Sequence, residues 1–186
     1  MASINPPVCD FGWQAPNFNL PDTRGKLASL QNSMGKNGLL VMFICNHCPY
    51  VKAILPRLIA DVRELQTLGV NTIAIMSNDA TEYPEDSVEN MQKIAREMDF
   101  PFPYLIDANQ QTAKDYGAVC TPDFFGFNNK FKLQYRGRFD ESRKETAPNS
   151  TRDLFHAMKL VAETGAGPKE QLASIGCSIK WKNELC

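Results

Sequence analysis

Two cysteines three positions apart form the pair best suited to chemistry in this chain. Cys45 and Cys48 enclose Asn46 and His47 in the string Cys-Asn-His-Cys. Paired thiols at this spacing serve redox chemistry or metal binding more often than structural bridges in a reducing compartment. The thiolate is the reactive form of cysteine, and a positive charge on His47 would favour it. We therefore predict Cys45 and Cys48 as catalytic residues with His47 in support; the alternative is two buried structural cysteines.

The flanking residues predict where this pair lies. Residues 38–44 form a short apolar run that is typical of a buried central strand. From Pro49 onward, apolar residues keep helical spacing over four turns until Gly69. The thiols would then lie at the carboxyl end of a strand and at the N-terminus of a helix. Unpaired N–H groups and the helix dipole stabilise a thiolate at such a place.

The rest of the chain alternates between strand and helix patterns. We expect a hairpin from 18–20 and 27–30, strands over 70–76 and 103–107, a short helix over 110–116, and a strand pair over 124–127 and 133–139. One further helix should begin near Asp86, with Asp86 as its cap and Glu89 three residues later, and a last one near Ser150–Asp153. This order predicts a three-layer α/β domain with a parallel core and an antiparallel end.

Composition sets the class of protein. The 186 residues, 43% of them hydrophobic, fit a single domain, which we place at 1–168 with a tail over 169–186 packed on or near it. A net charge of −1 gives no basic field for nucleic acid. No apolar run is long enough to cross a bilayer, and the first residues lack the features of a secretory leader. We expect a cytoplasmic protein without nucleic-acid or membrane partners.

A second signal is the dipeptide Thr121-Pro122, between the helix stop at Gly117 and the strand near Phe124. A trans proline that starts an edge strand is its simplest interpretation. Together with the strand–CxxC–helix unit and the proline inside that helix, however, it resembles the thioredoxin fold. The hairpin and the extra α–β unit between CxxC and Thr-Pro resemble the redoxin branch. The strings CNHCPYV, YGAVCTPDFFGF and GCSIKWK are similar to the peroxiredoxin-like (alkyl hydroperoxide reductase/thiol-specific antioxidant) group that carries a CxxC pair.

The resemblance spans roughly residues 17–181 and implies a thioredoxin-like fold without a cofactor. It also implies that Pro122 is a cis-proline facing Cys45 and Cys48, and that the backbone of Thr121 pairs with a bound substrate chain. Two departures stand out. Thioredoxins carry a Trp before the first cysteine and a buried acid in the preceding strand; this chain has Ile44 and no acid over 39–44.

The comparison with peroxiredoxins is also incomplete. When Cys48 is matched to the peroxidatic cysteine, Val41 replaces the family's proline and Cys45 its threonine. An activating arginine could come from Arg136 or Arg138. The histidine before Cys48 resembles the CxHC of strongly oxidising disulfide catalysts, in which a stabilised thiolate makes the disulfide a better oxidant.

Three functions follow as hypotheses. In a thiol–disulfide oxidoreductase, an exposed Cys45 attacks a substrate disulfide and Cys48 releases the product. In a thiol peroxidase, Cys48 becomes a sulfenic acid and Cys45 resolves it. Partners would be a protein disulfide or a peroxide as substrate and a thioredoxin-like protein or small thiol as reductant. The third hypothesis is a redox sensor or a soft-metal site built from Cys45, His47, Cys48 and Cys120, although one CxxC falls short of a structural zinc pattern.

The other cysteines receive weaker predictions. Cys120 precedes Thr121 and could join the redox chemistry or be one more small buried residue. Cys177 lies in the tail and could reach the site or pack the tail. We assign no role to Cys9 and Cys186, which lie near the termini, and none to His156.

Overall fold

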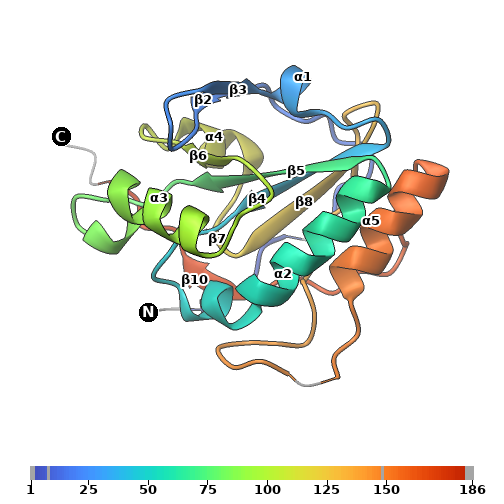
Figure 1. Cartoon of the computed structure of the whole chain (residues 1–186). Helices are drawn as coiled ribbons and strands as arrows, with labels where there is room; N and C mark the ends of the chain where they lie inside the picture. The colour runs from blue at the N-terminus through green and yellow to red at the C-terminus, as the bar shows by residue number, and fades with distance from the viewer. Residues whose placement is uncertain (1–2, 8, 148, 183–186) are drawn as a thin grey trace.

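The computed structural model describes residues 3–7, 9–147 and 149–182 (Figure 1). Its strands are β1 (Ser3–Ile4), β2 (Asn19–Pro21), β3 (Leu27–Ser29), β4 (Gly38–Phe43), β5 (Val70–Met76), β6 (Tyr104–Ile106), β7 (Cys120–Thr121), β8 (Asp123–Asn128), β9 (Leu133–Tyr135) and β10 (Gly176–Ser178). Its helices are α1 (Leu30–Ser33), α2 (Pro49–Thr67), α3 (Val88–Glu97), α4 (Gln111–Tyr116), α5 (Asp153–Thr164) and the 3-10 turn η1 (Pro84–Asp86).

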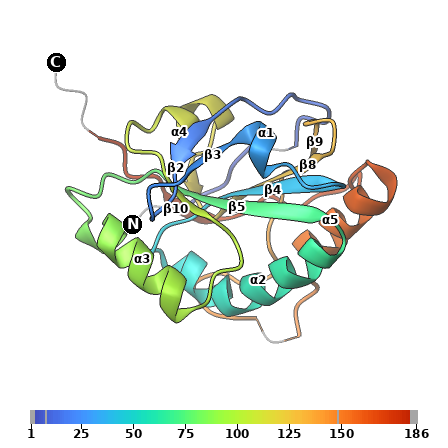
Figure 2. The same ribbon diagram turned by 45° about the horizontal axis from the view of Figure 1, so that its top comes forward.

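A five-stranded sheet in the order β6-β5-β4-β8-β9 forms the middle layer. Strands β4, β5 and β6 run parallel, whereas β8 and β9 are antiparallel to their neighbours. Helices α2, α3 and α5 cover one face, and α1, α4 and the β2–β3 hairpin cover the other (Figure 2). The predicted three-layer α/β fold, with its hairpin and its α–β insertion, is confirmed.

Strand β4 explains why its sequence is apolar throughout. Leu40 and Met42 face the cluster beneath α2 and α5, whereas Leu39, Val41 and Phe43 face the cluster beneath α4. All of these side chains are fully buried, because successive side chains of a strand point to opposite faces and both faces are covered. Each contributes about 1.5–3 kcal/mol of transfer free energy. The loop that carries Cys45 is therefore attached to a fully buried strand.

The structure corrects the predicted start of the helix near Asp86. Ser87, one residue later, caps α3 by accepting a hydrogen bond from the backbone N–H of Asn90. Asp86 ends the 3-10 turn η1 instead and is completely buried. Both residue types are good caps, and the choice of Ser87 leaves the Asp86 carboxylate free to point inward.

The strand predicted over 133–139 is shorter than expected and ends at Tyr135. Beyond this point the backbone N–H groups of Arg136 and Arg138 donate to Gln171 and Leu172 instead of to a ladder. The segment after α5 thus replaces the neighbouring strand here. Among the residues that the structure describes, no helix has both the length and the apolar character that a membrane crossing requires.

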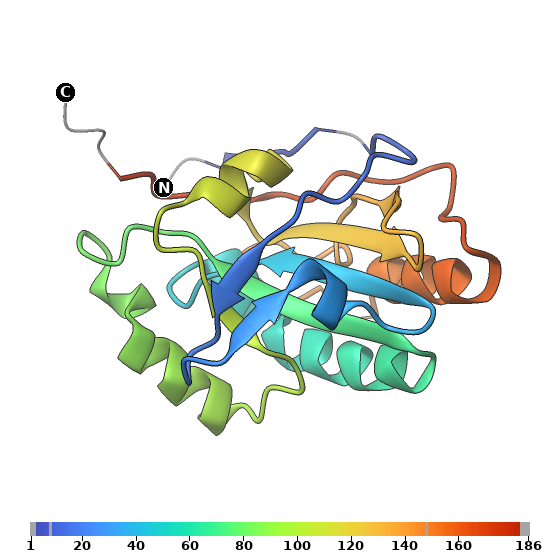
Figure 3. The ribbon, with the colours of Figure 1, turned by 90° about the horizontal axis from the view of Figure 1, so that it is seen from above.

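The same returning segment builds a second, small sheet. It crosses the length of the molecule from the end of α5 (Figure 3) and forms β10 between β1 and β7. All pairings are antiparallel, with Cys177 opposite Thr121 on one side and opposite Ser3 on the other. This sheet lies beside α2, because β10 contacts that helix.

Candidate active site

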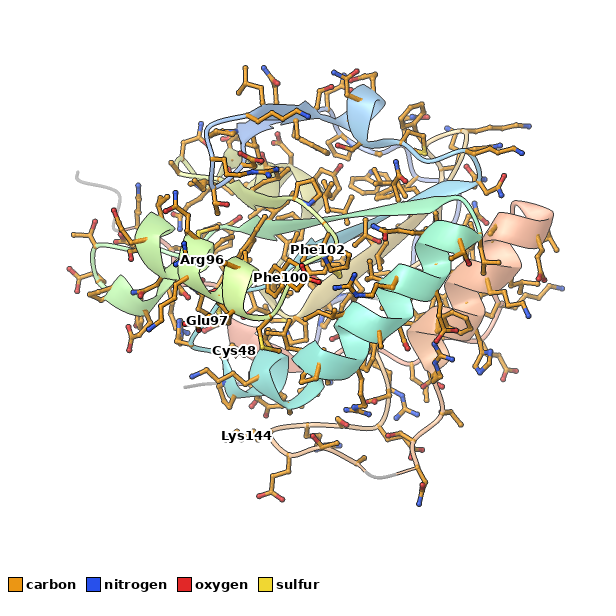
Figure 4. The ribbon with its side chains drawn as sticks, in the orientation of Figure 1. Cys48, Arg96, Glu97, Phe100, Phe102 and Lys144 are labelled. Carbon is orange, nitrogen blue, oxygen red and sulfur yellow. The ribbon has the colours of Figure 1, made fainter. Side chains whose placement is uncertain are left out.

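Cys48 is the N-cap residue of α2, and Cys45 lies on the loop between β4 and that helix. Figure 4 labels Cys48 at the first turn of α2. The strand–CxxC–helix arrangement is therefore present as predicted. The expected exposure of Cys45 is wrong, since Cys45 is 2% and Cys48 0% exposed. Thr121 of β7 contacts both sulfurs, and Cys177 of β10 lies against Cys48. Sequence periodicity could not reveal this cover.

Hydrogen-bond donors converge on the sulfur of Cys48. The Cys45 thiol donates to it and lowers its pKa; burial opposes the shift, and the backbone N–H groups of Cys177 and Val51 assist it. Sharing this proton with Cys48, together with burial and the negative charge of Asp86, raises the pKa of Cys45. Of the two thiols, Cys48 therefore carries the thiolate, because the N–H groups of a helix start favour negative charge.

Thr121 and Pro122 lie against both cysteines. The peptide bond between them is cis, as the resemblance implies. The Thr121 hydroxyl is 3.2 Å from the Cys45 sulfur. The Thr121 carbonyl oxygen is 3.0 Å from the Cys48 sulfur and accepts a hydrogen bond from the Cys48 thiol when that thiol is protonated. The backbone edge of Thr121, expected to pair with a substrate chain, pairs with Cys177 instead.

A buried carboxylate holds the loop between the cysteines. Asp86 Oδ1 accepts the backbone N–H groups of Asn46 at 2.7 Å and His47 at 3.4 Å. Its Oδ2 contacts Nδ1 of His47 at 2.7 Å and accepts from Asn78 at 2.8 Å. Burial alone would raise the pKa of Asp86, but the hydrogen bonds from His47 and Asn78 outweigh burial and lower it.

The histidine of the motif is consequently biased toward its charged form. The hydrogen bond to Asp86 raises the pKa of His47 despite partial burial, and the charge of Cys48 acts in the same direction. The imidazole also stacks on Tyr83, with ring centroids 5.2 Å apart and planes 14° apart. Sequence reasoning missed Asp86, Asn78 and Tyr83 as site residues. A CxxC motif carries no signal for partners some 30–40 residues away.

The structure keeps Cys45, His47 and Cys48 of the proposed soft-metal set together and sets Cys120 apart from them. Ligand atoms of Cys45, His47 and Asp86 lie within 4.8 Å of one another. Cys120 belongs to the other side of β7, because neighbouring side chains of a strand point in opposite directions and Thr121 faces Cys45. The carboxylate of Asp86 already accepts hydrogen bonds on both oxygens, so this cluster is organised as a hydrogen-bond network.

Cys120 has different surroundings from Cys48. Its thiol donates to the Pro122 carbonyl oxygen at 3.6 Å, and burial together with the charge of Asp123 raises its pKa. Asp123 is a fully buried carboxylate that pairs with Arg136 at 2.9 Å. Burial raises the pKa of Asp123 to about 6 despite this pairing.

The two arginines considered as peroxide activators are held elsewhere. Arg136 binds Asp123 and the carbonyl oxygen of Gly117, and its guanidinium lies 4.3 Å from the ring centroid of Phe125. Arg138 forms an ion pair with Asp153 at 2.6 Å. These side chains do not supply the arginine that the peroxiredoxin pattern expects.

The remaining cysteines differ in how close they lie to Cys48. Cys177 lies in the same buried cluster as Cys45 and Cys48, and its thiol and backbone N–H both reach Cys48. Cys9 is half-buried, and Arg136 and Gln171 contact it. His156 is exposed on α5, and Cys186 lies outside the described residues.

Comparison with known proteins identifies the family and supports the fold. Residues 11–139 match the family described as AhpC/TSA. An uncharacterized conserved protein from Geobacillus kaustophilus has a TM-score of 0.93 and 41% identity, covering 100% of this chain and 99% of that one. The thioredoxin domain of a thiol-disulfide oxidoreductase from Bacteroides vulgatus has a TM-score of 0.57 at 20% identity over 72% of this chain and 89% of that one, which is a likeness of fold.

Among curated proteins, the thiol-disulfide oxidoreductase ResA of Bacillus thuringiensis subsp. konkukian is 31% identical over 123 residues. The match covers 62% of this chain and spans about 62% of the length of that relative. The family match covers more than half of the chain, and the thioredoxin-like architecture agrees with it. The chain therefore belongs to the AhpC/TSA family, a family of oxidoreductases with the thioredoxin fold.

Proposed function

We propose that this protein is a thiol–disulfide oxidoreductase in which Cys45 and Cys48 cycle between a dithiol and a disulfide. One observation carries the proposal: both sulfurs lie at the start of α2, with Cys48 as its N-cap, and Thr121 before the cis-proline contacts both of them. The lowered pKa of Cys48 supports it. A thiolate held beside a second thiol can attack a disulfide and then be released by its neighbour. The name of the ResA relative supports the same chemistry.

The lowered pKa of Cys48 and the raised pKa of Cys45 support the opposite order of attack to the one expected from the sequence. The Cys48 thiolate attacks one sulfur of a substrate disulfide, the substrate bond breaks, and the first substrate thiolate leaves. Cys45 then loses its proton to that leaving group or to water and attacks Cys48. A Cys45–Cys48 disulfide forms while the second substrate thiolate leaves, so the substrate gains the two electrons that the protein loses. A thioredoxin-like protein or a small thiol would restore the dithiol.

His47 and Asp86 support the first step. A protonated His47 places a positive charge near the Cys48 thiolate, and the Asp86 carboxylate keeps that proton on the imidazole. Asp86 also fixes the loop by binding two of its backbone N–H groups. The carboxylate therefore acts through His47 and the loop, as a positioning residue.

The test is a disulfide-reduction assay with two substrates, oxidised glutathione and insulin, on the full chain. We expect the single variants Cys48→Ser and Cys45→Ser to lose turnover. Cys120→Ala is the matched control, because Cys120 is equally buried and lies beside Thr121 on β7. Full turnover in Cys48→Ser would contradict the proposal.

A trapping experiment assigns the order of attack. With Cys177 also replaced by serine, Cys45→Ser should accumulate a mixed disulfide between Cys48 and the substrate, measured by mass spectrometry. The corresponding Cys48→Ser chain should accumulate much less, because the pKa of Cys45 is raised. The reverse pattern would restore the order in which Cys45 attacks first.

A peroxidase is the second candidate, and the burial of both sulfurs favours it. Strand β10 occupies the edge of Thr121, so a small hydroperoxide reaches Cys48 more easily than a protein chain does. The thiolate would attack one peroxide oxygen, release an alkoxide or hydroxide, and become a sulfenic acid. Cys45 would then form the disulfide and release water.

Stopped-flow mixing with one equivalent of hydrogen peroxide distinguishes the two candidates. Loss of thiols far faster than in a free cysteine, with a Cys45–Cys48 disulfide as product, supports the peroxidase. Loss at the pace of a free thiol excludes it and leaves disulfide exchange as the activity.

A further inference from the structure

The C-terminal strand β10 occupies the position in which a substrate chain is expected. It pairs antiparallel with β7, and Cys177 lies directly opposite Thr121, the residue before the cis-proline. Residues directly opposite in an antiparallel pair present their side chains on the same face. The side chain of Thr121 faces Cys45, so the side chain of Cys177 lies on the active-site face as well.

The contact between this strand and the site is closely fitted. A Cβ atom on Gly176 would lie 2.2 Å from the Thr121 carbonyl oxygen, so only glycine permits this approach. Before the strand, the Ser174 hydroxyl donates to the Pro122 carbonyl oxygen at 2.9 Å. After it, the Lys180 backbone N–H donates to the Asn78 side chain at 2.9 Å, and Asn78 in turn binds Asp86.

This strand delivers a third thiol to the reactive sulfur. Cys177 is 2% exposed and belongs to the same buried cluster as Cys45 and Cys48, and its thiol and backbone N–H both act to lower the pKa of Cys48. Three thiols therefore meet at one place, with Cys48 in contact with each of the other two. In a thioredoxin-like site, a cysteine on a strand paired beside the cis-proline is placed as a substrate cysteine would be.

We propose that Cys177 is a third redox-active residue, an internal substrate thiol that forms a disulfide with Cys48. This inference rests on the proposed function, since it needs Cys48 to react with sulfur. The tail strand thereby completes the site instead of merely covering it.

The exchange requires no external oxidant once the first disulfide exists. The Cys177 thiol loses its proton to solvent, and its thiolate attacks Cys48 in the Cys45–Cys48 disulfide. The bond between Cys48 and Cys177 forms as the bond to Cys45 breaks, and the Cys45 thiolate takes up a proton. The oxidation level of the protein is unchanged, while the disulfide moves from the loop to the tail.

Cys120 provides the internal comparison. It is fully buried and its neighbour in β7 touches both catalytic cysteines, yet its thiol donates to the Pro122 carbonyl oxygen on the other side of the strand. Proximity along the chain does not make it a partner of Cys48. Strand register, which places Cys177 on the active-site face, makes the difference.

The test uses the full chain with Cys9→Ser, Cys120→Ala and Cys186→Ser, so that only three thiols remain. Cys45→Ser and Cys177→Ser are then added separately. Each reduced chain is treated with one equivalent of diamide, a thiol oxidant that takes two electrons and two protons. Free thiols are alkylated, and the linkages are mapped by mass spectrometry.

We expect a Cys48–Cys177 disulfide in most Cys45→Ser chains and a Cys45–Cys48 disulfide in most Cys177→Ser chains. If Cys48 is modified in the Cys45→Ser chain while Cys177 stays free, the inference is overturned and the proposed function stands. If Cys48 remains reduced in both chains, both fail.

The three-thiol parent guards against misfolding of a variant. Treated in the same way, it should contain both linkages, because Cys48 exchanges between its two partners. A parent that holds the Cys45–Cys48 linkage alone overturns the inference, whatever happens in the variants.

Discussion

Cys48 and Cys120 are equally buried thiols on either side of the same cis-proline segment, yet their acidities move in opposite directions. Each is 0% exposed. The hydrogen bond from Cys45, with backbone N–H groups beside it, lowers the pKa of Cys48. Burial raises the pKa of Cys120, and its hydrogen bond runs to a carbonyl oxygen. Burial alone therefore does not determine the reactivity of a thiol; the donors that meet it do.

The two buried carboxylates of the region repeat the contrast. Asp86 has hydrogen bonds on both oxygens, and its pKa is lowered. Asp123 has an oxygen without a hydrogen-bond partner, and burial raises its pKa to about 6. Neither carboxylate touches solvent. The completeness of the hydrogen-bond network decides in which direction burial leaves the pKa of each carboxyl.

The strongest test of the comparison removes each thiol in turn. Cys48→Ala should reduce the rate of disulfide reduction by about 10³-fold or more, because the nucleophile is lost. Cys120→Ala should stay within about twofold of the unmodified chain. Turnover per molecule with oxidised glutathione measures both. Equal losses of turnover in the two variants would mean that burial, and not the hydrogen-bond donors around the sulfur, determines the reactivity of a thiol.

The carboxylates should differ in what they contribute to stability. Asp86→Asn should lower the free energy of unfolding by about 3 kcal/mol, since it leaves His47 without its buried counter-charge. Asp123→Asn should cost less, because burial already works against this charge, as its pKa of about 6 shows, and Arg136 keeps the Gly117 carbonyl oxygen and the Phe125 ring as partners. Urea unfolding at pH 7 measures both values. A larger loss in Asp123→Asn would reverse the proposed ranking.

The pH dependence of stability sharpens the contrast further. The raised pKa of His47 contributes stability that is complete below about pH 6.5 and is lost as pH rises through the folded value. The lowered pKa of Asp86 contributes stability that is present above about pH 3.9 and lost as pH falls through the folded value. In the folded protein this pair is therefore strongest between these two limits.

Cys48 makes the protein more stable as pH rises, which is opposite to the effect of His47. Its lowered pKa adds stability that increases until pH reaches the pKa of the unfolded thiol, 9.0. The measurement therefore uses Cys48→Ser. Its unfolding free energy should decline between pH 6 and pH 9, and adding His47→Gln should flatten that slope. An unchanged slope would show that His47 does not titrate with folding.

The smallest effect belongs to Cys120. Cys120→Ala should lower the free energy of unfolding by about 1 kcal/mol through lost burial. It should leave the pH at which ultraviolet thiolate absorbance appears unchanged, because the donors around Cys48 remain. A displaced absorbance curve would indicate that the two sides of β7 are coupled.

Local sequence patterns were sufficient to predict the strand and the helix that hold the two cysteines. The apolar run of β4 and the helical spacing of α2 are short-range features, so the placement of Cys45 and Cys48 could be predicted from them. The family resemblance supplied the orientation of Pro122. The helical periodicity of α2 over four turns is the stronger of the two signals, and the continuous apolar run of β4 is typical of a strand buried on both faces.

Long-range partners could not be predicted. In the sequence, Asp86 and Ser87 are both typical helix caps. Only the fold shows that Ser87 caps α3 and that Asp86 contacts His47. Strand β10 has three residues and no periodicity, so the sequence holds no pattern from which its pairing with Thr121 could be predicted. The prediction that Cys45 is exposed was wrong for the same reason.

The pairing of β7 with β10 also has a consequence for biosynthesis. About 130 residues separate Cys48 from Cys177, and a ribosome needs roughly 6–26 s to add them at about 5–20 residues per second. During that interval the nascent chain already holds β4 and α2 but not the strand that covers their junction. Newly made Cys48 is thus open to thiol reagents and chaperones until the residues of β10 have left the ribosome, and a chain that stalls before that point lacks the strand that lies against this thiol.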